Sequence, residues 1–141
     1  MSRIFWDTNI FIYLMEGSGE HHNLAQKLLD RMLVRRDELI TSAMTLGELL
    51  VKPLESNRPD LAQHYEVLLG SRGVRVVSFD RDAARIYAKL RLDRTIRPPD
   101  AIQLACAAVA ETNLFVTNDA RLSQKTVSGI DFVLPLEKVF L

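Results

Sequence analysis

Short apolar runs alternate with longer stretches of helical periodicity along this chain. Runs with the length and composition of buried strands lie at residues 3–6, 39–42, 74–79, 114–117 and 132–134. Between them, apolar residues recur every three or four positions, as on one face of a helix, at residues 10–15, 21–36, 43–52, 59–69, 81–90 and 98–110. Strands that alternate with helices predict an α/β domain with a mainly parallel, five-stranded sheet and helices on both faces.

Several expected helix boundaries carry residues that commonly start or stop a helix. Ser42 and Asp80 are placed to cap the helices that follow them, and Pro53 is expected to end the first of these two helices. Pro98 and Pro99 suit the first turn of the last helix, which is apolar on nearly every side. We therefore expect this last helix to lie buried against the sheet.

The composition is that of an ordinary globular protein. The 141 residues fit one domain over residues 1–141, and 18 basic residues balance 18 acidic ones. Zero net charge argues against a simple polyanion-binding module, although a local basic rim is compatible with it. The one cysteine, Cys106, excludes an internal disulfide, and its Ala-rich setting predicts a buried hydrophobic role. With no signal-peptide pattern and no apolar run of about 20 residues, we expect a cytoplasmic protein that does not contact membranes.

Four acidic residues are expected at one edge of the sheet. Asp7 ends the first strand, and Asp119 follows the fourth. Glu48 lies between one and two turns into the helix after the second strand, and Asp100 lies at the start of the buried helix. Right-handed crossovers bring strand ends and the following helix starts to the same side of a parallel sheet, so these carboxylates are predicted to converge. For Asp100, the link at residues 92–98 must carry the chain back to that edge.

Each acid also has an ordinary structural explanation. Asp7, Asp100 and Asp119 suit the start of a helix or turn, and Glu48 suits a solvated helix face. Together they point to chemistry, because two carboxylates about 4 Å apart repel by about 4 kcal/mol at an effective dielectric constant near 20. Oxygen ligands without nearby His or Cys suit Mg²⁺ or Mn²⁺, and Mg²⁺ also binds substrate phosphate oxygens. The cluster therefore predicts a metal site for phosphodiester chemistry.

Four short motifs that contain these acids resemble the PIN-domain nucleases. The motifs are Asp7-Thr8-Asn9, residues 42–49, residues 99–105 and Thr117-Asn118-Asp119. The resemblance covers nearly the whole chain in the same order and at the same intervals, and it is most evident for the small VapC-type toxins of prokaryotic toxin–antitoxin pairs. One departure is the stretch at residues 94–97, which has no glycine where relatives often have one.

The resemblance implies a Mg²⁺- or Mn²⁺-dependent endoribonuclease that cleaves single-stranded or structured RNA. Asp7, Glu48, Asp100 and Asp119 match the four acidic positions of the family. Asp7 and Asp100 would hold one metal ion, while Glu48 and Asp119 would hold a second ion or orient the attacking water. The family also suggests a homodimer and a tight complex with an antitoxin protein that blocks the acidic pocket.

Basic residues close in sequence to the acids are candidates for contacts with flanking phosphates. Taken singly, each is better explained as solvated surface charge. These residues are Lys52, Arg94, Arg97, Arg121 and Lys125. The three histidines lie away from the four motifs, and we assign them no role: His21, His22 and His64.

Two other functions are compatible with the sequence. A receiver-like phosphoacceptor domain also gathers acids at strand ends, but it requires paired acids near the first strand, where this chain has Asp7 alone. A PIN-like binding module that has lost catalysis would have the same fold. The presence of all four acids speaks against this second alternative.

Overall fold

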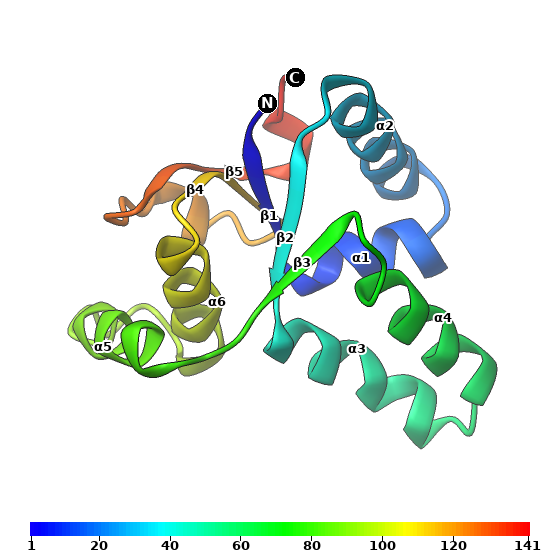
Figure 1. Cartoon of the computed structure of the whole chain (residues 1–141), viewed down its shortest axis with the longest axis horizontal. Coiled ribbons are helices and arrows are strands. Elements are labelled where there is room, and N and C mark those ends of the chain that lie inside the picture. Colours follow the sequence, from blue (N-terminus) through cyan, green and yellow to red (C-terminus); the bar gives the residue numbers. More distant parts are fainter.

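A wholly parallel β-sheet of five strands forms the centre of the computed structural model, which describes residues 1–141 (Figure 1). The strand order is β3-β2-β1-β4-β5, so β1 is central and β3 and β5 are the edges. The strands are β1 Arg3–Trp6, β2 Glu38–Ser42, β3 Val74–Val77, β4 Thr112–Thr117 and β5 Ile130–Pro135. All four strand pairings are parallel, which confirms the predicted α/β sheet.

Six α-helices connect the strands, and two short 3₁₀ helices lie towards the C-terminus. They are α1 Thr8–Glu16, α2 Glu20–Arg35, α3 Ala43–Glu55, α4 Pro59–Leu69, α5 Arg81–Leu90, α6 Pro98–Val109, η1 Leu122–Gln124 and η2 Leu136–Lys138. Two predicted caps are confirmed: Ser42 accepts a hydrogen bond from the Thr45 amide, and Asp80 accepts one from the Ala83 amide. None of the helices combines the length and apolar character that crossing a lipid bilayer requires.

Several element boundaries differ from those expected, among them those of α1, α3 and β3. Helix α1 begins at Thr8 rather than residue 10, because Asp7 caps it directly after β1. Helix α3 continues for two residues beyond Pro53, since this proline lies in the last turn and so interrupts little of the helical hydrogen bonding. Strand β3 ends at Val77 because its partner in the ladder is Ser42, the last residue of β2.

Alternating side chains along the strands give the sheet two buried faces. In β1, Phe5 faces the core formed with α5 and α6, and it stacks on Phe115 of β4 with 4.9 Å between ring centroids. Ile4 and Trp6 face the opposite core, which α1, α2, α3 and α4 cover (Figure 1). Helix α6 is buried as predicted, with Cys106 inside the first of these cores.

The parallel arrangement gathers the carboxyl ends of all strands at one edge of the sheet. Helices α1 and α3 begin at this edge, directly after β1 and β2. Exposed helix starts and strand ends provide polar side chains and unpaired backbone groups there, which is why ligands bind at this edge in open α/β sheets.

Candidate active site

All four sequence-predicted acids line one pocket at the carboxyl edge of the sheet. Its lining contains no hydrophobic residue and consists of Asp7, Thr8, Asn9, Glu48, Pro99, Asp100, Gln103, Asn118 and Asp119. The residues come from four separate segments of the chain, so the pocket exists only in the folded protein. The link before α6 brings Asp100 to the same edge as the other three acids, as the predicted convergence requires.

Asp7 is fixed between the two central strands and the first helix. Its carboxylate accepts hydrogen bonds from the Thr8 amide and from the Thr117 hydroxyl, each at 2.9 Å, and its own amide donates to the Val116 carbonyl at 3.0 Å. Asp7 therefore does cap α1, as the structural explanation required, and it also faces the pocket. The capping and site roles are compatible because one carboxylate has several acceptor positions.

Burial raises the pKa of Asp7 from 3.8 to about 6, with smaller contributions from the negative charges of Asp100 and Glu48. The hydrogen bonds from Thr117 and Thr8 act in the opposite direction and hold the rise in check. Burial also raises the pKa of Asp100, followed by repulsion from the Asp119 charge. The four carboxylates thus interact electrostatically across the pocket.

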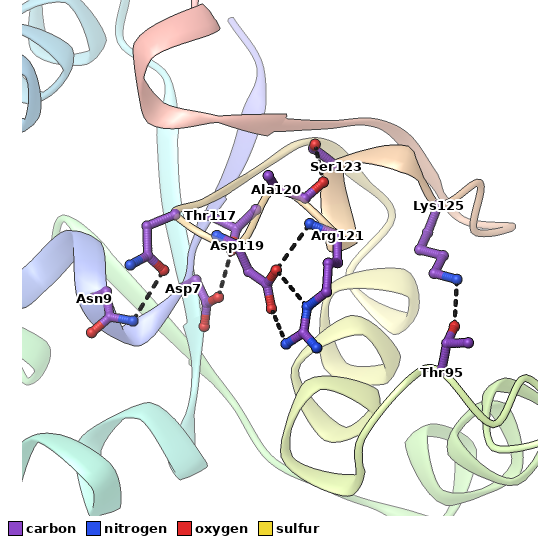
Figure 2. A network of polar contacts seen from close by, with 10 residues as sticks. Asp7, Asn9, Thr95, Thr117, Asp119, Ala120, Arg121, Ser123 and Lys125 are labelled. Atoms are coloured by element: carbon purple, nitrogen blue, oxygen red, sulfur yellow. Dashed lines mark hydrogen bonds and ion pairs between the residues drawn. The ribbon is translucent and has the colours of Figure 1, made fainter.

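Glu48 and Asp119 each have a strong partner of their own. The Thr8 hydroxyl donates to Glu48 Oε1 at 2.6 Å, which ties α3 to the first residue of α1. Arg121 forms an ion pair with Asp119 at 3.1 Å, and its amide donates to Asp119 Oδ1 at 2.9 Å (Figure 2). The hydrogen bond from Arg121 lowers the pKa of Asp119. Asp119 is therefore ionised while it holds this arginine.

The acids do not form a preassembled ion cage. No three His, Cys, Asp or Glu side chains lie close enough together to constitute a metal-binding group. This separation follows from the contacts above, because hydrogen-bond donors draw Asp7, Glu48 and Asp119 towards different partners while like charges repel.

A buried polar network beneath the pocket was missed by the sequence analysis. Gln103 of α6 is 2% exposed and donates from Nε2 to the hydroxyls of Thr45 at 2.7 Å and Thr8 at 3.2 Å. Its amide oxygen accepts a hydrogen bond from Ser42. The available signal was a lone amide inside an otherwise apolar helix, which is costly to bury unless it is hydrogen-bonded. Gln103 positions Thr8, and Thr8 in turn positions Glu48.

Four of the five expected phosphate-contacting residues gather beside the acids. A hollow that we call the basic groove is lined by Arg94, Thr95, Arg97, Asp100, Asp119, Arg121, Leu122, Gln124 and Lys125. It shares Asp100 and Asp119 with the acidic pocket, so the two are continuous. Lys125 is held by Asp93 at 3.0 Å and Thr95 at 2.6 Å. The fifth candidate, Lys52, lies apart from the other four, because it lines a separate hollow between α1, α3 and α4.

The raised pKa of Asp7 should make the stability of chelator-treated protein depend on pH. The folded state binds the Asp7 proton more tightly than the unfolded chain, so the free energy of unfolding should fall as the pH rises from about 4 to about 6, by at most about 3 kcal/mol. Asp7→Asn removes this titration. In thermal melts, the free energy of unfolding of the variant should therefore rise by about 1–2 kcal/mol relative to that of the wild type as the pH rises from about 4 to about 6. A difference that stays constant with pH would contradict this account.

Replacing Gln103 with leucine should destabilise the fold despite the similar side-chain size. The change leaves buried hydroxyls without their partner, which costs about 2–4 kcal/mol in the free energy of unfolding. Gln63→Leu, on the exposed surface of α4, is the matched control and should change stability by less than about 0.5 kcal/mol. Urea unfolding measures both, and equal effects would show that the network contributes nothing.

Known proteins share this fold. VapBC2 from Rickettsia felis, bound to a DNA fragment from its promoter, gives a TM-score of 0.75 at 16% identity and covers 94% of this chain and 98% of that one. DNA-bound VapBC from Salmonella typhimurium gives a TM-score of 0.73 at 21% identity and covers 96% of this chain and 99% of that one. VapC20 from Mycobacterium tuberculosis, a sarcin–ricin loop cleaving toxin, gives a TM-score of 0.70 at 19% identity and covers 89% of this chain and 97% of that one. At such identities these structures establish the fold alone.

The family follows from the sequence itself. A search of curated protein sequences gave no significant match. A family model for the PIN domain matches residues 4–127, a span that includes all four acids of the pocket. The chain belongs to the PIN domain family.

Proposed function

We propose that this chain is an endoribonuclease that uses Mg²⁺ or Mn²⁺ to hydrolyse RNA phosphodiester bonds. The observation that carries the proposal is the convergence of Asp7, Glu48, Asp100 and Asp119 on one pocket with no hydrophobic lining. A fold that brings like charges together in this way gains stability from a bound cation. Membership of the PIN domain family supports a cation as the ligand of this pocket.

The donor set of the pocket fits a hard divalent cation. Its side-chain donors are carboxylate, hydroxyl and amide groups, with no thiol or imidazole among them. We assign Asp7 and Asp100 to a first ion and Glu48 and Asp119 to a second ion or to the attacking water. A bound Mg²⁺ or Mn²⁺ would neutralise charge on the scissile phosphate and lower the pKa of the water nucleophile.

The chain's own residues orient the reacting groups. The Thr117 and Thr8 donors hold the Asp7 carboxylate, while the Thr8 hydroxyl holds Glu48. The basic groove supplies Arg94 and Arg97 next to the acidic pocket, where guanidinium groups suit phosphate oxygens. A neutral chain can therefore still bind RNA, because the positive charge it needs is local.

The toxin role and its partners are part of the same proposal. Two of the solved structures above are VapBC assemblies bound to DNA, and the third is a toxin that cleaves the sarcin–ricin loop. We propose that this chain pairs with an antitoxin protein that covers the acidic pocket, and that it acts in the cytoplasm. The alternative is a PIN-domain binding module without catalysis. A receiver-like phosphoacceptor is disfavoured by the family match and by the single acid after β1.

Loss of either proposed ligand of the first ion should abolish most of the activity. Purified protein is expected to cleave RNA with Mg²⁺ or Mn²⁺ and not with chelator, and Asp7→Asn and Asp100→Asn should each lower the rate by at least about 100-fold. Asp80→Asn is the matched control, because it makes the same change at an exposed helix cap away from the pocket. A Asp7 or Asp100 variant that cleaves at the wild-type rate would contradict our assignment of that residue.

Ion binding can be checked in the same proteins without any substrate. A divalent ion at ten times its dissociation constant stabilises the native state by about 1.4 kcal/mol, or roughly 3–6 °C in melting temperature for a domain of this size. Mn²⁺ should produce this shift in wild type and in Asp80→Asn, and a smaller one in Asp100→Asn. A full shift in Asp100→Asn would exclude Asp100 as a ligand.

The proposed homodimer has a candidate surface on the α3–α4 pair. Apolar side chains that water reaches there are Val51, Leu54 and Val67, with 52%, 68% and 61% of their surface exposed. Sedimentation should show self-association at micromolar concentration, and Leu54→Glu should weaken it because a charge would be buried. Leu92→Glu, at an 83% exposed loop position, is the control. A 16.0 kDa species alone in the wild type would contradict the dimer.

A further inference from the structure

An aromatic pair lies close to the acidic pocket, on the side away from the basic groove. Tyr13 of α1 and His21 in the first turn of α2 stack with 4.5 Å between ring centroids and 17° between ring planes. Tyr13 is half-buried and His21 is exposed. The Tyr13 carbonyl also contacts His22 Nδ1 at 3.0 Å, so the pair is anchored to the start of α2. His21 lies away from the four sequence motifs, so its contact with Tyr13 becomes visible only in the structure.

Hydrogen bonds connect this pair to the lining of the pocket. The Asn118 side chain donates to the Tyr13 hydroxyl at 2.9 Å, and Asn9 donates to the Asn118 amide oxygen at 3.0 Å. Asn9 and Asn118 both line the acidic pocket, and Asn9 lies next to Asp7 (Figure 2). Tyr13 is five residues beyond Thr8 of the pocket, which corresponds to about 7.5 Å along a helix.

The aromatic pair and the basic groove lie on opposite faces of the sheet. Helices α1 and α2 cover one face, while α6, which follows Arg94 and Arg97, packs on the other (Figure 1). The acidic pocket lies at the sheet edge between them. An RNA strand can follow the basic groove with its backbone and place its scissile phosphate at the acids. The same RNA strand then continues towards Tyr13 and His21.

We propose that the outer face of His21, supported from behind by Tyr13, is a stacking subsite for an unpaired nucleobase next to the scissile phosphate. This inference rests on the nuclease function proposed above. Single-stranded RNA is recognised largely by bases that stack on aromatic side chains, and two stacked rings provide a stiffer platform than one. Tyr13 is a positioning residue here, since Asn118 and His22 fix its orientation and it in turn fixes His21.

The test uses a short single-stranded RNA with the fluorescent base 2-aminopurine at either its 5′ or its 3′ end, because stacking quenches this base. Rapid mixing with Mg²⁺ records binding before any cleavage. We expect quenching with one of the two RNAs. His21→Leu should abolish the quenching and weaken binding by about 5- to 100-fold, whereas His21→Phe should retain both. His64→Ala, at an exposed position on α4, is the control and should also retain both.

The outcomes separate this subsite from the nuclease function and from a purely structural role. Full quenching in His21→Leu, or no quenching of either RNA by wild-type protein, would overturn the subsite. Loss of quenching in His21→Phe as well would also overturn it, because a stacking role requires only the ring. Unchanged melting temperatures in the Leu and Phe variants would show that the effect does not arise from a loosened turn. Quenching without cleavage would overturn the nuclease assignment alone.

Discussion

Mutual repulsion among four carboxylates is the constraint on which the rest of this structure depends. The sheet edge brings the acids together, and a different set of contacts stabilises each acid. Asp7 is buried and hydrogen-bonded, with its pKa raised to about 6, whereas Asp119 is kept ionised by Arg121. Glu48 is held by the Thr8 hydroxyl. The fold without a metal ion therefore tolerates the charges by separating and neutralising them individually, and the divalent ion that we propose would replace several of these contacts at once.

The same constraint explains why a polar layer lies where a hydrophobic core would otherwise be. Gln103, Thr45 and Ser42 are buried beneath the pocket and satisfy one another's hydrogen bonds. This layer holds Thr8, which contacts Glu48, so a residue on α6 determines the position of a carboxylate on α3. A buried polar network stabilises a fold only when every member has its hydrogen-bond partners. Gln103 is therefore a structural requirement of the site although it has no charge.

The placement of the acids at one edge of the sheet could be predicted because it depends on local rules. A strand end, a helix start after Pro98 and Pro99, and the parallel crossover suffice to place Asp7 and Asp100 at one edge. Strand order, the hydrogen bond between Ser42 and Gln103, and the stacking of Tyr13 on His21 were not accessible in this way. These features depend on which segments meet in space, and the spacing of apolar residues carries no information about that. Lys52 lies apart from the basic groove for the same reason, because its proximity to Glu48 in the sequence does not place it in the same hollow.

Local charge exchange would allow a neutral chain to bind the RNA that we propose as its substrate. Two of the four cations of the basic groove are already partnered, Arg121 with Asp119 and Lys125 with Asp93. Ion pairs as exposed as these contribute about 0–1 kcal/mol, so exchanging a carboxylate for a phosphate costs little. The Debye length is about 8 Å at physiological salt, so these cations act only on phosphates that come close to them. An arginine that leaves Asp119 for a phosphate also frees that carboxylate for a cation. Substrate and metal ion would then favour each other's binding, because both draw on the same ion pair.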